Sequence, residues 1–254
     1  MCSSDLNATL DSNVVHDNVG PGLWCDQACN NITFSSNRVY FNNGHRDTGP
    51  DGSPQIFFEI SEGALIQGNA VWGATGYWPG IYISSSGNAE VRWNVVAWSS
   101  RGLMAYLQTR CCIPAQGETN VYFHDNDVIM GPGAGDYAVL WGDDGSNQIT
   151  TPSNHAWNNA IWYPTPENGQ LRFRWGNQQF SSLSGFAATP GGLASTYLSN
   201  QQAAAALNTF VIPNLSGGAL AATASVSGLA ATTSVAGAKP VTAPAAAKSA
   251  AVKR

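Results

Sequence analysis

A short motif, Asn-x-Val, occurs five times in the first half of the chain and restricts the fold more than any other feature. Its asparagines are Asn13, Asn37, Asn69, Asn94 and Asn126, at intervals of 24, 32, 25 and 32 residues. In the last four units an apolar residue precedes the Asn by three positions (Phe34, Ile66, Val91 and Phe123) and a small or apolar residue by five (Ile32, Ala64, Ala89 and Val121). A third apolar burst lies further upstream, as in GLWCD, IFFEI, GIYIS and GLMAY. A repeat of about two dozen residues with three short strands indicates the coils of a solenoid rather than hairpins.

Stacked coils bury together the apolar side that one coil is unable to bury alone. Their strands then form parallel sheets, with neighbouring strands about 4.8 Å apart. The repeated Asn side chains are expected to hydrogen-bond to one another along the turns and to satisfy backbone groups there. Over residues 7–165 this organisation resembles the right-handed parallel β-helix superfamily, the pectate-lyase-like proteins. The resemblance implies an all-β solenoid, and a β-sandwich of short strands is the alternative.

The two ends of the chain depart from the repeat. The first six residues, MCSSDL, read as a translated library adapter, so we expect an N-terminally truncated product that lacks its signal peptide and first coils. Residues 166–212 are expected to form the last coil and a segment that caps the open end, with a short helix in LSNQQAAAALNTF. Residues 213–254 are rich in Ala, Ser, Thr and Pro and lack aromatic residues, which is typical of a disordered tail.

Charge and hydropathy argue against several classes of partner. Only 11% of the 254 residues are charged, and every Asp and Glu lies at or before Glu167. Nucleic-acid binding needs clustered Lys and Arg, which this acidic body lacks, so no nucleic-acid partner is expected. No apolar run approaches the roughly 18 residues that span a membrane, so no membrane partner is expected either. A trimeric spike would need a coiled-coil stem, which the sequence does not offer, so we expect a monomer.

Four cysteines follow the adapter-like start. They lack the spacing of a zinc site, because no His or Cys stands at the usual distance. In an exported chain Cys25 and Cys29 are able to close a small loop. The neighbouring Cys111 and Cys112 either cross-link or stay reduced. Buried or incidental thiols are the alternative for all four.

Strand periodicity separates inward from outward side chains, because successive residues of a strand point to opposite faces. In the upstream burst, two columns are predicted to point inward: Leu23, Ile56, Ile81 and Leu103, and Cys25, Phe58, Ile83 and Ala105. Two columns are predicted to point outward: Trp24, Phe57, Tyr82 and Met104, and Asp26, Glu59, Ser84 and Tyr106. A contiguous outward row of aromatic rings calls for a ligand, and flat rings beside carboxylates suit an extended polysaccharide. We therefore predict that Trp24, Phe57, Tyr82 and Tyr106 bind polysaccharide.

Asp26 and Glu59 are the candidate catalytic residues. Adjacent coils would bring their carboxylates to roughly 5–6 Å, about the separation that retaining glycosidases use. Like charges this close raise one pKa, which leaves an acid beside an ionised base or nucleophile. Alternatively the same two residues bind Ca²⁺, and the metal would stabilise the enolate of a lyase reaction. A solvated acidic pair without chemistry is the third interpretation.

Three insertions between strands supply further candidates. Residues 42–55 contain His45 and Arg46, which bind a uronate, act in proton transfer or remain only solvated. Residues 76–80, GYWPG, contain Trp78, which is either a sugar platform or packed on the coil. The segment LQTRCCIPAQGE contains Arg110, a substrate-binding candidate and a weaker candidate for the base of a lyase.

The strings GPGLWCD and IFFEIS narrow the resemblance. They are similar to a subgroup of secreted bacterial β-helix proteins in which a Gly-Leu/Ile-Trp-x-Asp coil precedes a Phe-x-Glu-Ile-Ser coil. The subgroup implies a secreted or cell-surface location, but it commonly has His where this chain has Phe58. The Gly-His-Gly string of polygalacturonases, the Arg-x-Pro-x-x-Arg string of pectate lyases and the Asp-Pro-His string of alginate epimerases are absent. The resemblance therefore implies a fold and no particular reaction.

Two functions of different classes follow from these patterns. The first is a carbohydrate-active enzyme, a hydrolase or a lyase, that cleaves a polysaccharide with Asp26 and Glu59. The second is a non-catalytic glycan-binding or cell-surface protein, in which the aromatic ladder binds and the two acids only orient hydroxyl groups.

Overall fold

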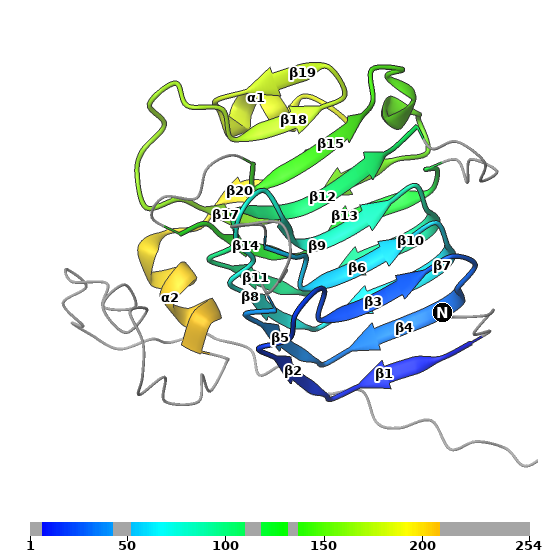
Figure 1. Ribbon diagram of the computed structural model, residues 1–254. Coiled ribbons are helices and arrows are strands. Elements are labelled where there is room, and N and C mark those ends of the chain that lie inside the picture. The colour runs from blue at the N-terminus through cyan, green and yellow to red at the C-terminus, as the bar shows by residue number, and fades with distance from the viewer. Residues whose placement is uncertain (1–6, 43–51, 110–117, 132–136, 209–254) are drawn as a thin grey trace, which may run out of the picture.

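The computed structural model describes residues 7–42, 52–109, 118–131 and 137–208, which wind as stacked coils of parallel strands (Figure 1). Each coil contributes one strand to each of three sheets, named A, B and C here. Sheet A consists of β1 (Thr9–Asp11), β4 (Asn30–Ser35), β7 (Glu62–Gln67), β10 (Gly87–Arg92), β13 (Val121–His124) and β16 (His155–Trp157). Sheet B consists of β2 (Val14–His16), β5 (Arg38–Tyr40), β8 (Ala70–Trp72), β11 (Val95–Ala97), β14 (Asp127–Ile129), β17 (Ala160–Trp162) and β20 (Thr196–Tyr197). Sheet C consists of β3 (Leu23–Asp26), β6 (Ile56–Glu59), β9 (Pro79–Ser84), β12 (Arg101–Leu107), β15 (Val139–Asp143), β18 (Phe173–Trp175) and β19 (Gln178–Phe180).

Within the described residues, neighbouring strands run parallel except at the C-terminal end, where β18 and β19 are antiparallel. A β-sandwich is built from antiparallel sheets joined by hairpins, so this alternative is wrong. The predicted all-β, right-handed parallel β-helix is confirmed.

The chain turns sharply between sheets A and B, and this corner explains which residues precede the asparagines. The residue just before the asparagine has left-handed backbone geometry in every coil, with φ between 53° and 63°: Ser12, Ser36, Gly68, Trp93, Asp125 and Asn158. Glycine adopts this conformation freely, and Asn and Asp visit it more often than other residues do. The tight corner therefore selects Ser, Gly, Asp and Asn, with Trp93 as the bulky exception.

The predicted asparagine ladder is confirmed at these same corners. Asn69 Nδ2 donates to Asn94 Oδ1, and Asn94 Nδ2 donates to Asn126 Oδ1, both at 2.9 Å. Asn94 Nδ2 also donates to the Ile66 carbonyl at 2.9 Å. Asn159 adds a rung beyond the five asparagines of the motif, because Asn126 Nδ2 donates to its Oδ1 at 2.9 Å. Each of these buried amides thus satisfies the backbone of the preceding coil and is itself bonded to the asparagine of the next coil.

The core lies inside the coils and consists of the predicted inward columns. Phe58, Ile83 and Leu103 have no exposed surface, and all members of the two columns belong to one continuous hydrophobic cluster. Cys25 of β3 and Cys29, in the turn between β3 and β4, form a disulfide. The small loop predicted for these two cysteines is therefore confirmed.

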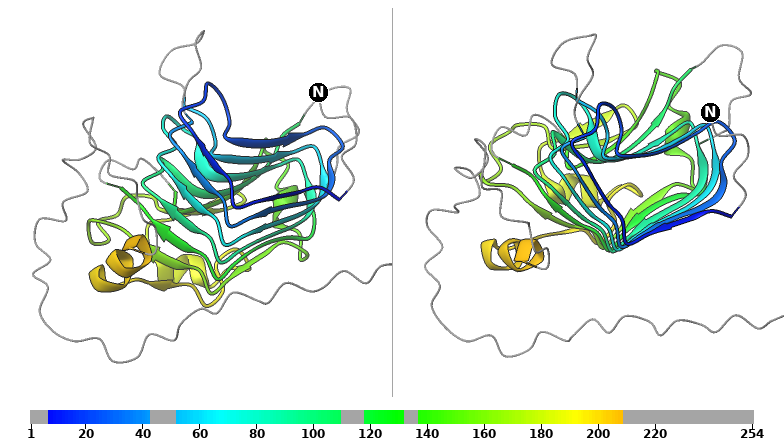
Figure 2. Two further views of the ribbon diagram at one scale, coloured as in Figure 1. Left: turned by 90° about the horizontal axis from the view of Figure 1, so that it is seen from below. Right: turned by 60° about the horizontal axis from the view of Figure 1, so that its bottom comes forward.

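The C-terminal part of the fold covers one end and one side of the coils. At the end, α1 (Leu183–Ala187) follows β19, and the Phe186 ring stacks on Phe173 at 4.8 Å; the short 3₁₀ turn η1 (Gln148–Thr150) lies beside β15. The predicted helix is present as α2 (Asn200–Asn208), which lies outside sheet B (Figure 2). Its Ala203 is buried in an apolar cluster with Ala97 and Ile129 of β11 and β14, the strands that α2 contacts. No helix among the described residues is long and apolar enough to cross a membrane.

Candidate functional site

The outer face of sheet C carries the predicted ladder in the predicted register. Trp24 pairs with Phe57, Phe57 with Tyr82, and Tyr82 with Met104 in successive strands. Leu140 extends the column by one coil, because it pairs with Met104. The ring centroids of Trp24 and Phe57 lie 5.9 Å apart and those of Phe57 and Tyr82 4.8 Å, each pair stacked. The ladder therefore runs across five coils along the axis of the solenoid.

Most of this ladder is covered, whereas the sequence predicted an open face. Trp24 is 50% exposed, but Phe57 is only 7% exposed and Tyr82 only 2%. Trp78, Tyr106 and Tyr137 pack against the buried members, which include Met104 and Leu140. Covering an apolar column is favourable by about 25 cal/mol per Å² of surface removed from water. The expectation that Phe57 and Tyr82 present free ring faces to a ligand is therefore wrong, and Trp78 packs on the coil.

The covering side chains form the walls of a groove with a volume of about 490 Å³ over the ladder. Its floor comes from the column itself, at Tyr82, Met104 and Leu140. Its walls are Tyr77, Trp78, Arg101, Tyr106, Gln108, Tyr137 and Arg174. These residues belong to four successive coils, so the groove follows the axis of the solenoid. This length and direction suit a ligand that is itself extended.

The polar groups of the groove are cationic or neutral. Arg101 lies over the exposed ring of Tyr77, with its guanidinium carbon 5.6 Å from the ring centroid. Arg174 Nε donates to the Gly176 carbonyl at 2.7 Å. None of the described residues that line the groove is acidic, although the chain as a whole has a formal net charge of −5. The described lining therefore contains two arginines and no acid, and Asp144 lies beside it, hydrogen-bonded to Tyr106.

Two tyrosine hydroxyls of the groove, those of Tyr82 and Tyr106, stay protonated at neutral pH. Burial raises the pKa of Tyr82, whose hydroxyl accepts a hydrogen bond from Gln108 Nε2 at 3.0 Å. Burial also raises the pKa of Tyr106, and a hydrogen bond to Asp144 adds to that shift. Both hydroxyls are therefore hydrogen-bond donors and acceptors rather than bases.

Asp26 and Glu59 lie next to each other at one end of the ladder. They are partners in the pairing of β3 and β6, as predicted, and Ser84 and Tyr106 continue their column. Glu59 is 5% exposed, and Asp26 is half-buried. The Asp26 Oδ1 atom is shielded from solvent and has no hydrogen-bond partner among the described residues. Neither acid lines the groove, which begins one coil further along at Tyr82.

Metal binding by this pair would need additional ligands. Among the described residues, no group of three or more His, Cys, Asp or Glu side chains is arranged to hold a metal ion. Calcium takes six to eight oxygen ligands. Asp26 and Glu59 alone therefore do not make a calcium site.

Some predicted candidates lie outside the described residues. These are His45, Arg46 and Arg110, together with the Cys111–Cys112 pair, the first six residues and the tail from residue 213. Their predicted roles stay predictions.

Sequence reasoning missed several groups that the coils bring together. Arg101 and Tyr137 each stand two residues before an aligned burst and were therefore not assigned to a column. Arg174 continues the outward column itself, because it pairs with Leu140 in the next strand. Leu140 was within reach of that rule, because YAVLWGD repeats the inward-outward alternation of the earlier bursts. Glu118 is a further buried acid, and burial raises its pKa well above the usual range. Glu118 aligns with the corner serines Ser61 and Ser86 rather than with the groove.

A family model described as right handed beta helix region matches residues 1–151, more than half of the 254 residues. The matched segment includes every strand from β1 to β15, and with them the ladder and most of the groove. No curated protein and no solved structure matches the chain significantly.

Proposed function

The chain belongs to the right-handed β-helix family, and we propose that it binds an extended acidic polysaccharide along the outer face of sheet C. The fold suits carbohydrate-active and cell-surface proteins in general. The observation that carries the proposal is the axial groove above Tyr82, Met104 and Leu140, whose walls combine aromatic rings with two arginines.

The aromatic and cationic groups of the groove are complementary to such a polymer. The exposed ring of Tyr77 offers an apolar face to the C–H faces of sugar rings, and Trp78, packed on the ladder, forms the wall beside it. Arg101 and Arg174 pair with carboxylate or sulfate groups, for which the planar guanidinium offers two parallel donors. The two arginines of the groove would also repel a positively charged polymer, so the groove favours anionic polymers over cationic ones.

The exposed Trp24 supports a ligand longer than the groove. Among the described rings of the ladder, only Trp24 has half of its surface exposed to solvent. It lies two coils before Tyr82 in the same column. A polymer that follows the axis would therefore leave the groove and reach Trp24. Parallel strands stack about 4.8 Å apart, close to the length of one sugar unit.

The Cys25–Cys29 disulfide supports an extracellular or cell-surface location for this binding. Disulfides persist in oxidising compartments and are rare in the cytosol of most organisms. The bond closes a loop around Asp26, at the end of the ladder where the polymer would emerge. We place the protein outside the reducing cytosol on this ground.

Cleavage of the bound polymer is the second candidate function. One observation favours it. The Oδ1 atom of Asp26 is buried beside Glu59 and has no hydrogen-bond partner among the described residues. An orphaned carboxylate oxygen is costly unless a proton, an ion or a substrate group completes it. In this alternative the two acids act as an acid and a base or nucleophile on the sugar between Trp24 and the groove.

A screen against acidic and neutral polysaccharides separates the two functions. Reducing ends, ultraviolet absorbance of unsaturated products and binding are recorded together, with and without calcium, for the natural chain and for the Asp26→Asn and Glu59→Gln variants. Binding without products in all three proteins supports the non-catalytic function. Products that disappear in both variants while binding persists establish cleavage by this pair. Failure to bind any acidic polymer contradicts the proposal as a whole.

A further inference from the structure

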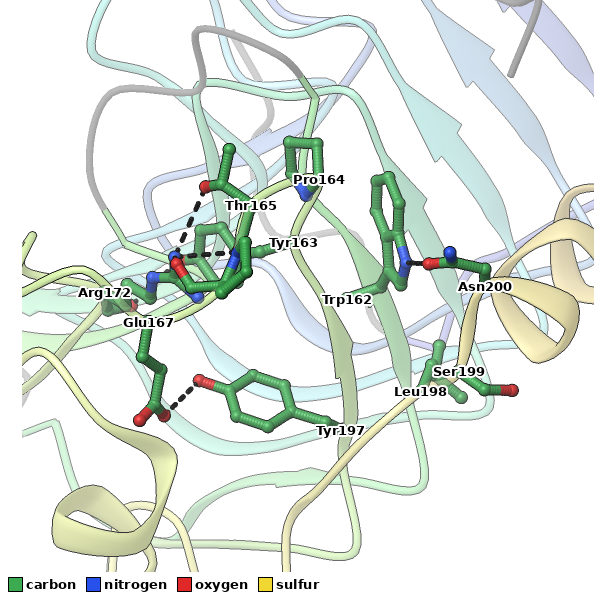
Figure 3. Close-up of a pocket in the computed structure, with 11 residues that line it drawn as sticks. Trp162, Tyr163, Pro164, Thr165, Glu167, Arg172, Tyr197, Leu198, Ser199 and Asn200 are labelled. Atoms are coloured by element: carbon green, nitrogen blue, oxygen red, sulfur yellow. Dashed lines mark hydrogen bonds between the residues drawn. The ribbon is translucent and has the colours of Figure 1, made fainter. Parts of the chain in front are cut away.

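A second cavity, of about 500 Å³, lies at the C-terminal end of the coils (Figure 3). The end of β17, the loop that follows it and the segment between β20 and α2 form its walls. Its lining residues are Trp162, Tyr163, Pro164, Thr165, Pro166, Glu167, Arg172, Tyr197, Leu198, Ser199 and Asn200. It shares no residue with the groove on sheet C.

One wall of this cavity is polar and held in place by hydrogen bonds. The Tyr197 hydroxyl donates to Glu167 Oε1 at 2.7 Å, and the Leu183 amide donates to the same oxygen at 2.9 Å. Arg172 lies beside them, with Nη2 donating to the carbonyls of Thr165 and Pro166. Both bonds to Glu167 end on Oε1, which fixes the carboxylate against Tyr197 at the edge of the cavity (Figure 3).

The buried arginine has an unused donor. Arg172 is only 2% exposed, and its guanidinium carbon lies 4.2 Å from the centroid of the Tyr163 ring. Its Nε has no hydrogen-bond partner among the described residues. Because this Nε is closed to solvent, it does not face the open cavity. Arg172 contributes to the wall its positive charge and a guanidinium held in place beside Glu167.

The opposite wall is aromatic and fixed in orientation. The Trp162 indole Nε1 donates to Asn200 Oδ1 at 2.9 Å, which ties the ring to the start of α2. Figure 3 shows this ring on one side of the cavity, with Arg172 and Glu167 on the other and Tyr197 below. The cavity therefore places an apolar ring face opposite a row of donors and acceptors.

We propose that this cavity binds a neutral sugar, one or two rings in size, between Trp162 and the Glu167–Tyr197–Arg172 wall. Sugar rings have an apolar C–H face and an edge of hydroxyls that donate and accept at once, which matches the two walls. The volume lies within the usual range of small-ligand sites, roughly 300–1,000 Å³. The site is distinct from the groove and is a second carbohydrate contact of the protein.

The charges of the wall favour a neutral ligand over an anionic one. Glu167 and Arg172 have opposite charges, so the cavity has no net positive charge. The hydrogen bond from Tyr197 and that from the Leu183 amide hold the pKa of Glu167 below its usual range, so the carboxylate is ionised at neutral pH. Burial and the hydrogen bond to Glu167 raise the pKa of Tyr197 to about 12, so its hydroxyl stays protonated. A uronate would meet the Glu167 carboxylate and be repelled.

Saturation-transfer NMR of the full chain tests the proposal. The probes are glucose, galactose, mannose, rhamnose and cellobiose, with galacturonate as the charged comparison. We expect at least one neutral sugar to bind. Glu167→Gln and Tyr197→Phe should each weaken that binding about tenfold, the loss expected for one hydrogen bond to a charged or fixed partner. Glu167→Gln retains the oxygen that accepts from Tyr197 and Leu183, so the fold is preserved, which thermal unfolding checks.

The groove provides the matched control. Tyr77→Phe removes a hydroxyl from the groove and should leave neutral-sugar binding unchanged, and the cavity variants should leave binding of acidic polysaccharide unchanged. The proposal is overturned if no neutral sugar binds, if both cavity variants bind neutral sugar as well as the natural chain, or if galacturonate binds more tightly than the neutral sugars and loses that affinity in the cavity variants. Each of these results leaves the proposed function of the groove untouched.

Discussion

Single side chains at the corners have more influence on this fold than their size indicates. Asn94 is fully enclosed and connects three coils, because its Nδ2 bonds to Ile66 and Asn126 and its Oδ1 accepts from Asn69. Removing such an amide leaves several buried donors and acceptors without partners. The cost of an unsatisfied buried group is about 1–3 kcal/mol.

We therefore predict that Asn94→Ala lowers the free energy of unfolding by about 3 kcal/mol. Asn13→Ala, at the exposed end of the same ladder, should cost less than about 1 kcal/mol. Chemical denaturation of the two variants and the natural chain gives both values. Equal losses at the two positions would show that the ladder does not stabilise the interior coils in the way proposed.

Glu118 gives the protein a pH-dependent stability. Its folded pKa lies above its unfolded value, since burial disfavours the charged form. This contribution is fully present below the unfolded pKa of about 4.3 and is lost as the pH rises toward the folded pKa. Folding at neutral pH therefore requires Glu118 either to take up a proton or to bury a charge.

Glu118→Gln should accordingly raise the melting temperature at about pH 8 and have little effect at about pH 5. Thermal unfolding followed by circular dichroism at the two pH values measures this difference. Asp127→Asn is a comparison, because burial raises the pKa of Asp127 as well. A Glu118→Gln variant that is less stable at the higher pH would mean that the carboxylate is ionised and useful in the folded state.

At the scale of secondary-structure elements, α2 illustrates how the outside of a coil is completed. Sheet B presents an outward apolar cluster that includes Tyr40, Trp72 and Ile129, and α2 adds Ala203 to it by packing against β11 and β14. Nine residues are too few for a stable isolated helix, since helices shorter than about 12 residues are marginal in water. The helix therefore depends on its contacts with the sheet.

Ala203→Glu should detach α2, whereas Ala205→Glu, on the exposed face of the same helix, should not. Hydrogen exchange of residues 200–208 should rise at least tenfold in the first variant, with the coils almost unaffected. Unchanged exchange in Ala203→Glu would mean that the helix is held by other contacts, such as the bond between Trp162 and Asn200.

The elements could be predicted from the sequence because two periods constrain them together. Alternation within each burst assigned Ile83 and Tyr82 to opposite faces, and the Asn-x-Val spacing set the register between coils. The fate of the outward column could not be predicted in this way. Whether Phe57 and Tyr82 stay open depends on where inserted loops place Trp78 and on how Tyr106 and Tyr137 turn back over the sheet. Repeats constrain coils, whereas insertions between them follow no repeat.

At the scale of the whole molecule, the two proposed carbohydrate sites differ in shape and in charge, so they are expected to bind different ligands. The groove on sheet C is long, follows the axis and contains Arg101 and Arg174, whereas the cavity at the C-terminal end is small and has no net charge. The acids Asp26 and Glu59 lie beyond one end of the groove. An extended acidic polymer and a short neutral sugar would therefore bind at separate places on one rigid solenoid.

The most direct test of the central claim is the affinity of the protein for an acidic polysaccharide when both groove arginines are neutralised. The double variant Arg101→Gln with Arg174→Gln should bind about a hundredfold more weakly than the natural chain, because each guanidinium contributes a charge-assisted hydrogen bond worth about tenfold. Arg92→Gln, on the outer face of sheet A, removes the same kind of charge and should leave the affinity unchanged. Isothermal titration with polygalacturonate and with alginate measures all three proteins. Equal affinities for the double variant and the natural chain would contradict the assignment of the groove as the polysaccharide site.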